Sequence, residues 1–325
     1  MDYKRIKYVD KDMSPIVYGT ATIFLIEACE RKRTEEQKEK AFELLDMDYS
    51  KGINCFDCAT MYGESILGEW MEARGNRDKI VVLTKCAHPN DYRDRVTEFD
   101  ILSDYHDSAA KLRTNYFDIY LLHRDNPAVP VGKIVDIMNK LHDEGKIGAF
   151  GGSNWTHERL DAANEYAAKH NLIPFSAASP NYSLADQIKD PYPGNCTTLT
   201  GKANEAARKW YLENNMPAFA YSGLARGFLS GMIKGDDPEG ARKILGGKIN
   251  AYDCEENFEK LRRAEKLALE KGCSVAQISV AWLLAQPINV FVLTSPIDEE
   301  QLTDTLKSTE IKLTAKECAY LNLED

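Results

Sequence analysis

The sequence predicts an α/β protein with a (β/α)8 TIM-barrel fold, formed as a single domain over residues 1–325 with a short segment ahead of the first barrel strand. Eight short apolar runs alternate with segments of helical periodicity, and no linker separates two halves of the chain. The runs are apolar almost throughout, as parallel strands buried on both faces are. A doubly wound sheet is the alternative, but residues 19–22 lack the G-x-G-x-x-G turn that it would favour.

The elements alternate in order along the chain. The strands are expected at residues 15–19, 52–57, 80–85, 117–122, 147–152, 173–178, 217–221 and 288–293. The first helix opens with a capping box from Thr34 to Gln37. Further helices are expected at 64–74, 103–113, 131–141, 158–169 and 203–213, then two after the seventh strand, of which one is 274–285, and a last one at 299–306.

The composition argues against nucleic acids and anionic membranes as partners. The formal net charge is −10, whereas such partners select clustered Lys and Arg. No apolar run approaches the roughly 20 residues of a membrane-spanning helix, and no signal-peptide core follows the first residues. We therefore expect a cytoplasmic protein whose partner is a small molecule or another protein.

The eight cysteines are scattered, and a chain of this length does not need disulfides, so we expect free thiols. Cys55 and Cys58 have the C-x-x-C spacing of a redox motif or of half a zinc site. No second pair follows at metal spacing, and the pair lies on a predicted strand rather than at a helix start, where thiol pKa values fall. We expect no metal. Five histidines lack ligand spacing and are expected in solvent: His88, His106, His142, His157 and His170.

Four polar residues lie at the ends of three consecutive predicted strands. Asp57 ends the second strand, and Tyr62 follows in the next loop. Lys85 ends the third strand and His123 follows the fourth. Barrel active sites gather at the carboxyl ends of the strands, so we expect these four side chains to converge. The residues two and four positions before Asp57, Lys85 and His123 are apolar, as expected of a shared barrel interior.

Such a cluster suits the protonation of a carbonyl oxygen while a hydride reaches its carbon. A free phenol is a poor acid at neutral pH, and we expect the Lys85 ammonium to lower the pKa of Tyr62. Asp57 would hold Lys85 charged and oriented. His123 could bind the substrate oxygen or pass a proton. None of these side chains carries hydride, so a cofactor must supply it.

These residues resemble the catalytic tetrad of the aldo-keto reductases. Residues 145–155 are similar to the family's strand-five motif, and residues 220–227 are similar to its strand-seven motif. The resemblance extends over nearly the whole chain. It implies NAD(P)H-dependent, reversible reduction of an aldehyde or ketone, with Tyr62 as general acid assisted by the other three residues.

The resemblance also implies a cofactor site. Ser153 and Asn154 would bind the nicotinamide carboxamide, and Tyr221 would stack on the ring. Ser222 and Leu224 fall where the family holds the pyrophosphate. The complete implied set is Gly19, Thr20, Asp57, Ser153, Asn154, Ser179, Tyr221, Ser222, Leu224, Arg226, Ser295, Gln301 and Thr305.

Two departures from the family concern the cofactor. Ser179 stands where Gln commonly reaches the carboxamide. At the adenosine 2′-phosphate site the family often has Lys or Gly, then Arg, then Asn, and this chain has Ser295, Gln301 and Thr305. An Arg fork is the natural clamp for a phosphate, and the acidic residues 298–300 would repel one. NADPH is the family default, and NADH is nearly as well supported.

Several of these residues have a second interpretation. Ser153 and Asn154 could cap the helix that begins near Thr156, and Tyr221 could belong to the barrel core. The implied substrate-binding residues are Tyr62, His123 and Trp155. Tyr182 and Tyr192 could line the same pocket or only hold their loop in place. The polar loop 180–200 indicates a polar, sugar-derived carbonyl substrate, and the oligomeric state is not readable.

Two other functions stay open. Schiff-base aldolases keep a nucleophilic lysine at the end of a barrel strand, so Lys85 could attack a carbonyl directly, although Asp57 would keep it charged. The barrel could also be a non-catalytic nucleotide-binding subunit that senses redox state or docks to a partner.

Overall fold

The computed structural model describes residues 1–192 and 195–324, and its fold is a closed (β/α)8 barrel with strands in the order β1 to β8. The fold class predicted from the sequence is therefore confirmed. Residues 193 and 194, which belong to the predicted pocket loop 180–200, lie outside the described residues, as does residue 325. The strands are β1 Ile16–Gly19, β2 Cys55–Asp57, β3 Val81–Cys86, β4 Phe117–Leu122, β5 Ile147–Ser153, β6 Ala177–Ser179, β7 Ala218–Ala220 and β8 Val290–Thr294.

Helices alternate with the strands. They are α1 Ile23–Ala28, α2 Glu35–Ser50, α3 Glu64–Arg74, α4 Glu98–Leu112, α5 Val131–Asp143, α6 His157–His170, α7 Glu205–Glu213, α8 Pro238–Leu245, α9 Glu255–Lys271, α10 Val275–Leu284, α11 Glu299–Lys307 and α12 Ala315–Leu321. Short 3₁₀ turns are η1 Lys202–Asn204, η2 Ala225–Gly227, η3 Gly246–Ala251 and η4 Ser308–Glu310. The predicted capping box that opens α2 is present, with Thr34 and Gln37 bonded to each other's backbone.

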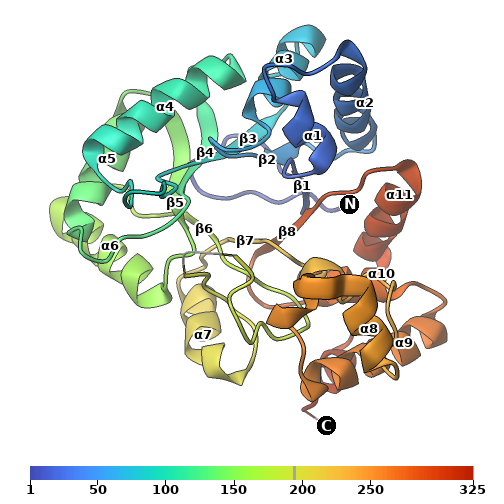
Figure 1. The fold of residues 1–325 in the computed structure, drawn as a ribbon. Helices are drawn as coiled ribbons and strands as arrows, with labels where there is room; N and C mark the ends of the chain where they lie inside the picture. Colours follow the sequence, from blue (N-terminus) through green and yellow to red (C-terminus); the bar gives the residue numbers. More distant parts are fainter. Residues whose placement is uncertain (193–194, 325) are drawn as a thin grey trace. The chain divides into compact units, whose positions relative to one another are not determined.

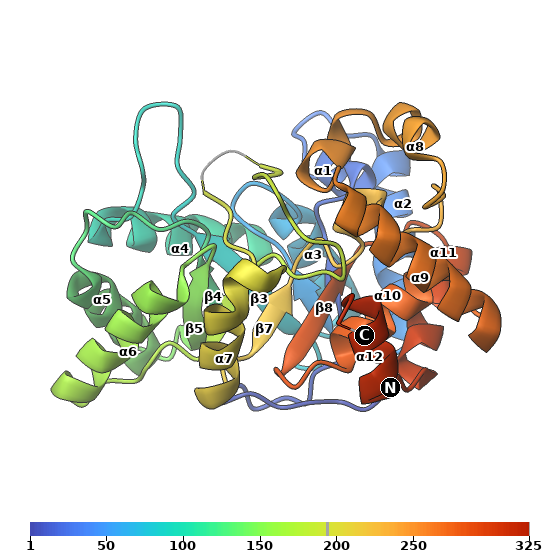
Figure 2. The same ribbon diagram turned by 90° about the horizontal axis from the view of Figure 1, so that it is seen from below.

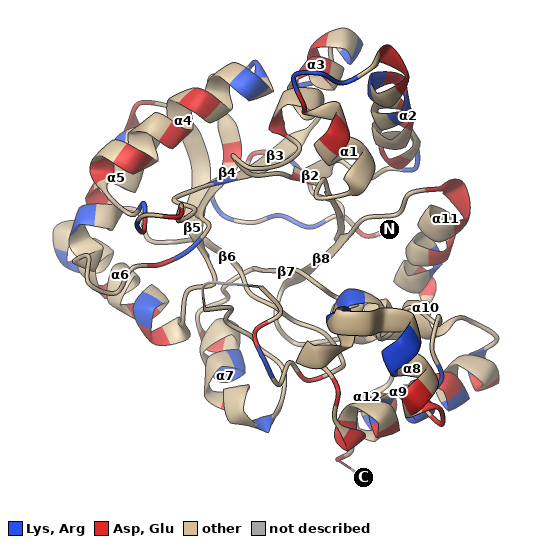
Figure 3. Ribbon diagram, in the orientation of Figure 1, with Lys and Arg blue, Asp and Glu red and all other residues tan. Residues whose placement is uncertain are grey.

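The chain divides into two compact units. The N-terminal unit is Tyr3–Ser179, and the C-terminal unit is Pro180–Asp325 together with Met1–Asp2. In the N-terminal unit, α2 to α6 lie outside β1 to β6 (Figure 1), and the turned view again places α4 to α6 outside β3 to β5 (Figure 2). Charged residues of this unit gather on the helices, while its strands are mostly uncharged (Figure 3). The single domain over residues 1–325 stays a prediction.

The strand register of the N-terminal unit places the polar strand ends over an apolar interior. Asp57 pairs with Leu83, and Leu83 pairs with Ile119. Lys85 lies one layer further along and pairs with Leu121. Residues in register on parallel strands point to the same side, and all five side chains are buried. The alternation predicted from the sequence is therefore present.

Strand β6 is shorter than predicted, because it begins at Ala177 and not at Ile173. At Ile173 and Phe175, side-chain amides take the place of the expected hydrogen bonds between strands. The Asn139 side chain accepts from Ile173 N at 2.8 Å and donates to Ile173 O at 3.0 Å. The Asn164 side chain does the same for Phe175, at 2.8 and 3.3 Å. The backbone at Ile173 and Phe175 is thus satisfied by α5 and α6, whereas Ser176 N donates to the Phe150 carbonyl oxygen of β5 at 2.8 Å.

Three helices were not predicted. Helix α1 has only 6 residues, too few for a helical period to be read. Helix α8 begins after the N-cap Asp237 with Pro238 in its first turn, so it adds a third helix between β7 and β8 where two were expected. Helix α12 follows a capping box between Thr314 and Glu317. Both caps are visible in the sequence and are typical start signals.

In the C-terminal unit, β7 and β8 pair in parallel, with Ala218 opposite Val290 and Ala220 opposite Val292. Across residues 1–192 and 195–324, no single helix has the length and apolar character needed to cross a membrane. Helices α9 and α10 pass that test only as a pair, and they meet at a bend of 98°.

Candidate active site

The N-terminal unit brings Asp57, Tyr62 and Lys85 into contact. The Lys85 ammonium forms an ion pair with Asp57, and its Nζ lies 3.1 Å from the Tyr62 hydroxyl oxygen. Lys85 Nζ also donates to the Cys58 carbonyl oxygen at 3.1 Å. Asp57 and Lys85 are only 4% and 3% exposed, so the pair is shielded from solvent. Of the four residues predicted to converge, Lys85 therefore touches both Asp57 and Tyr62.

A tight turn sets the position of Tyr62. The next residue, Gly63, precedes α3 with a left-handed φ of 76°, and a Cβ there would lie 1.8 Å from Thr20 Oγ1. The Thr20 hydroxyl donates to the Asp57 carbonyl oxygen at 2.9 Å. Only glycine fits this approach, so Thr20 and Gly63 together hold the start of the Tyr62 loop against the end of β2.

Burial governs the electrostatics of the cluster. It disfavours the Lys85 ammonium, but the charges and hydrogen bonds of Asp57 and Tyr62 together outweigh this effect and raise the pKa of Lys85 above its ordinary value. Burial also raises the pKa of Tyr62 to about 12, although Lys85 acts in the opposite direction. Lys85 thus acts in the predicted direction, but desolvation of the phenolate exceeds the attraction of the lysine, so the net pKa of Tyr62 is raised. Tyr62 keeps its proton at neutral pH.

His123 lies at the end of β4 and its ring meets that of Tyr62 edge-on, with centroids 6.1 Å apart. Burial lowers the pKa of His123 well below its usual value, and the nearby charges of Lys85 and Arg124 act in the same direction. Its Nδ1 is buried and has no hydrogen-bond partner within the described residues. His123 is therefore a neutral imidazole with an unused polar atom beside Tyr62.

A second histidine at this site was missed by the sequence analysis, which expected it in solvent. The His88 ring is half-buried and meets the His123 ring edge-on, at a centroid distance of 4.9 Å. Its Nδ1 lies 2.8 Å from the Pro89 carbonyl oxygen, which orients the ring. His88 lies only three residues beyond Lys85. This position just after a strand end was the sequence feature that could have placed it at the site.

Ser153 and Asn154, at the end of β5, form a hydrogen-bonded group with Ser179 at the end of β6. Ser153 Oγ donates to the Ser179 carbonyl oxygen at 3.0 Å, and Asn154 N donates to the same oxygen at 3.2 Å. Asn154 Nδ2 donates to the His123 carbonyl oxygen at 3.3 Å. The alternative that this pair caps α6 is wrong, because Thr156 is the cap residue. Thr20, beside Asp57, and Gly19 belong to the same unit, at the end of β1.

Four other predicted cofactor residues lie in the loop after β7, in the C-terminal unit. Tyr221 is half-buried, so it is not ordinary barrel core. The backbone of the loop is unusual, because Ser222 and Arg226 have left-handed φ values of 54° and 56°. Ala225 N donates to Ser222 O at 2.7 Å, and Gly227 N donates to Leu224 O at 3.0 Å. Left-handed residues in a short turn can direct N–H groups toward one point and form a concavity for anions.

Arg226 itself is engaged within the C-terminal unit. Its Nη1 donates to the Pro191 carbonyl oxygen at 2.8 Å, and its guanidinium lies 4.8 Å from the centre of the Tyr192 ring. Tyr192 in turn lies 6.4 Å from the Tyr221 ring, centroid to centroid. Tyr192 is therefore part of the loop group around Tyr221, whereas Tyr182 is 1% exposed and packs on Trp282 in the core.

The predicted adenosine end lies at α11. Ser295 and Gln301 are exposed, and Thr305 is half-buried. Asp298 caps the helix, accepting from Gln301 N at 2.8 Å and from Gln301 Nε2 at 3.1 Å. Figure 3 shows the acidic start of this helix in red. A carboxylate thus already occupies the helix end that would attract a phosphate.

Trp155 was implied as a substrate-binding residue and is 2% exposed. Its ring packs on Phe175 at 5.2 Å and lies under the Arg159 guanidinium at the same distance. Its indole Nε1 is buried with no hydrogen-bond partner in the described parts of the chain. Substrate contact by Trp155 stays a prediction.

The C-x-x-C pair does not form a reactive site. Cys55 and Cys58 are buried free thiols, and burial raises the pKa of each well above the ordinary value. Within residues 1–192 and 195–324, no group of three or more His, Cys, Asp or Glu side chains could hold a metal ion.

Comparison with known proteins identifies the family. Residues 15–323 match the model of the Aldo/keto reductase family. The aldo-keto reductase YhdN of Bacillus subtilis is 26% identical over 77% of this chain and 72% of its own length. The aryl-alcohol dehydrogenase [NADP(+)] of Phanerodontia chrysosporium is 28% identical over 88% of this chain and 76% of its own. A putative voltage-gated potassium channel subunit beta of Schizosaccharomyces pombe is 26% identical over 82% and 78%.

The match covers nearly the whole chain, including all eight strands and the loops that follow them. Family members use NAD(P)H and act on small-molecule carbonyl compounds. The protein belongs to the aldo/keto reductase family and is an NAD(P)-dependent oxidoreductase.

Proposed function

We propose that this protein reduces an aldehyde or ketone to an alcohol, reversibly, with Tyr62 as the proton donor. The observation that carries the proposal is the buried contact of Lys85 Nζ with both Asp57 and the Tyr62 oxygen. A protonated phenol next to a fixed ammonium can release its proton when negative charge develops on a substrate oxygen. Lys85 then stabilises the phenolate, and Asp57 keeps Lys85 charged and oriented.

His123 acts as a neutral donor in this scheme. A neutral imidazole carries one ring N–H, which can bind the substrate oxygen that Tyr62 protonates. The low pKa of His123 keeps a second positive charge away from Lys85. The proposed catalytic residues are thus Asp57, Tyr62, Lys85 and His123, with Trp155 as a further substrate contact.

Each unit, taken by itself, offers residues suited to part of a nicotinamide dinucleotide. Ser153 and Asn154 offer a hydroxyl and an amide at a strand end beside the His123 backbone. The loop after β7 offers left-handed residues whose N–H groups suit a pyrophosphate. When bound, the cofactor supplies the hydride. Tyr221, half-buried beside Tyr192, offers an aromatic face for the ring.

The Schiff-base alternative is disfavoured by the ionisation of Lys85. A lysine nucleophile must be neutral, whereas the Asp57 pair holds Lys85 charged. The non-catalytic alternative predicts cofactor binding without turnover. One relative is named as a channel subunit, but the buried Asp57, Lys85 and Tyr62 contact favours an enzyme.

The decisive test is Tyr62→Phe. We expect kcat/KM for butanal and benzaldehyde to fall by roughly 10² to 10⁴, the usual contribution of a general acid. Cofactor affinity, measured by quenching of the four tryptophans, should stay within about twofold, since removing a hydroxyl leaves the implied cofactor contacts in place. A variant that reduces either aldehyde at the normal rate would remove Tyr62 from this role.

Cofactor preference is tested by titrating NADPH and NADH in the same assay. We expect their dissociation constants to agree within about tenfold, because residues 295–305 contain no Arg or Lys and Asp298 caps α11. Gln301→Arg should shift the ratio toward NADPH, since a charged clamp contributes roughly 1.5 to 3 kcal/mol. A wild-type preference for NADPH above a hundredfold would contradict this expectation.

A further inference from the structure

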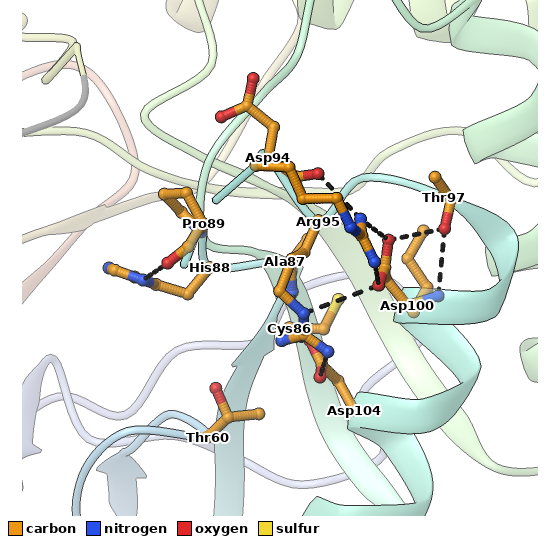
Figure 4. Close-up of polar contacts among 12 residues, drawn as sticks. Thr60, Cys86, Ala87, His88, Pro89, Asp94, Arg95, Thr97, Asp100 and Asp104 are labelled. Carbon is orange, nitrogen blue, oxygen red and sulfur yellow. Dashed lines mark hydrogen bonds and ion pairs between the residues drawn. The ribbon is translucent and has the colours of Figure 1, made fainter. Parts of the chain in front are cut away.

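A strained backbone turn after β3 holds His88 in place. Ala87, the residue before it, is fully buried and has a left-handed φ of 59°, a conformation that L side chains rarely adopt. The Ala87 N–H donates to Asp104 Oδ2 on α4 at 2.8 Å, and Asp104 is only 2% exposed (Figure 4). Strain of this kind persists only where the surroundings fix it, and it gathers at functional sites. The direction of the His88 side chain is therefore a built feature of the fold.

Two arginine–carboxylate pairs tie the far end of the same loop to α4. Arg95 donates to both oxygens of Asp104, at 2.6 and 3.2 Å (Figure 4). Arg93 donates to both oxygens of Asp100, at 2.6 and 2.7 Å. Both carboxylates are buried, and bidentate pairs fix geometry as well as adding energy. The loop that carries His88 is thus anchored at its end as well as at its start.

The His88 ring is also fixed in rotation. Its Nδ1 lies 2.8 Å from the Pro89 carbonyl oxygen, and a carbonyl oxygen can only accept, so Nδ1 carries the ring hydrogen (Figure 4). Desolvation lowers the pKa of His88, so the ring is uncharged at neutral pH. The ring meets that of His123 edge-on, with centroids 4.9 Å apart. An oriented, neutral ring therefore lies against the histidine that is proposed to bind the substrate oxygen.

His123 lacks the hydrogen bond that usually orients a functional imidazole. The tautomer and orientation of such a histidine are commonly set by a bond to its second ring nitrogen. His123 Nδ1 is buried and has no hydrogen-bond partner within residues 1–192 and 195–324. Its backbone N–H donates to the Cys86 carbonyl oxygen at 2.7 Å, which fixes the backbone but not the ring. Ring packing is therefore left to orient the imidazole, and both Tyr62 and His88 meet it edge-on.

We propose that His88 is a positioning residue, which holds the His123 imidazole in the orientation that directs a ring nitrogen at the substrate oxygen. This inference rests on the proposed reductase function, because it concerns how His123 reaches the same substrate. In this role His88 acts through His123 and forms no bond to the reacting atoms. The anchored loop after β3 transmits the rigidity of α4 to the His123 ring.

The test is a double-variant cycle of His88 and His123, measured with butanal and benzaldehyde. His88→Ala should lower kcat by roughly tenfold to a hundredfold, the cost of misplacing a catalytic group by about 1 Å, while KM changes by less than about threefold. His88→Phe keeps a flat ring at this position and should recover most of the lost kcat. Adding His88→Ala to His123→Gln should cause less than about a twofold further loss, because the effects of residues that act as a unit are not additive.

Nuclear magnetic resonance gives a readout that does not depend on turnover. The ring-nitrogen chemical shifts of isotope-labelled histidine report which nitrogen carries the hydrogen. The His123 signals, identified by their loss in His123→Gln, should shift in His88→Ala and return toward the wild-type values in His88→Phe. His106→Ala is the matched control, because His106 is an exposed histidine on α4 whose ring meets Tyr105 edge-on at 5.3 Å. It should change neither kcat nor the His123 signals.

The possible failures are distinguishable. An unchanged kcat in His88→Ala would overturn the inference, as would losses that multiply in the double variant, since His88 would then act independently of His123. A higher KM with unchanged kcat and unchanged His123 signals would make His88 a substrate contact only. If His88→Ala does not fold, His88→Leu, which fills the space without a flat ring, takes its place in the cycle. Wild-type protein that reduces neither aldehyde with either cofactor would instead overturn the proposed function, and the positioning role with it.

Discussion

Two buried carboxyl groups of the N-terminal unit, Asp57 and Asp48, differ in what surrounds them. Asp57, at the end of β2, has the Lys85 ammonium as its partner. Asp48, on α2, is completely buried, and neither of its oxygens has a hydrogen-bond partner among the described residues. Burial raises the pKa of Asp48 to about 8. An ionised carboxylate survives burial when a cation is supplied, and otherwise the group retains its proton.

The two carboxyl groups differ in whether they serve catalysis or only affect stability. The Asp57 and Lys85 pair keeps two charges in a dry environment, where they can influence Tyr62. Asp48 lies near the Tyr18 phenol, whose pKa is raised by burial first and then by Asp48. The Tyr18 hydroxyl is also buried and has no partner at hydrogen-bond geometry within residues 1–192 and 195–324, although the nearby Thr22 side chain acts to lower its pKa. We find no catalytic use for Asp48 and Tyr18, so their polar groups should cost stability.

The largest effect is expected from making Asp57 resemble Asp48. Lys85→Met removes the partner, and it should lower kcat/KM by roughly 10² to 10⁴, since Tyr62 loses its charged neighbour. The free energy of unfolding should fall by about 3 to 5 kcal/mol at pH 8, because breaking a buried ion pair strands one charge. Urea denaturation and steady-state kinetics measure the two effects.

The double variant Asp57→Leu/Lys85→Met is the control for that experiment. It should recover much of the lost stability, because no unpaired charge stays buried, while its activity should stay low. Recovery of activity together with stability would show that the pair only supports the fold.

The second effect concerns the pH dependence of stability at Asp48. The pKa of Asp48 is about 8 in the folded chain and 3.8 for an ordinary exposed Asp, as in the unfolded chain. Between these two pH values the folded protein therefore keeps a proton on Asp48 that the unfolded chain has lost. The resulting stability is complete below pH 3.8 and is lost as the pH rises toward 8. We expect wild-type protein to lose more free energy of unfolding between pH 5 and pH 8 than Asp48→Asn does, by about 1 to 4 kcal/mol. Parallel pH profiles for the two proteins would contradict an unpaired Asp48.

The smallest effect is expected at Tyr18. Tyr18→Phe deletes a buried hydroxyl that lacks a partner in the described structure, so the free energy of unfolding should change by less than about 1 kcal/mol, toward greater stability. A loss well above that value would reveal a hydrogen bond to Asp48 or to a buried water. Thermal unfolding of wild type and Tyr18→Phe at pH 6 measures this change, with Tyr120→Phe on β4 as a comparison.

Much of the site was predictable because it follows strand ends. The predicted bounds of α3 and β4 agree with the structure, and the register brings Asp57 and Lys85 to adjacent layers of the interior. The cofactor and substrate roles of the individual residues stay predictions. The bounds of β6 were wrong because Asn139 and Asn164, distant in the sequence, satisfy its backbone from neighbouring helices.

The sequence by itself determined the order of strands and helices, the family, and the four polar residues at consecutive strand ends, because periodicity, caps and motif spacing are local properties of the chain. Only the tertiary structure decided which charges are paired. The raised pKa of Tyr62, the contact of His88 with His123, and the absence of a partner for Asp48 among the described residues all depend on burial and on neighbours distant in the sequence. Desolvation is a property of the folded surroundings, so no local pattern could reveal it.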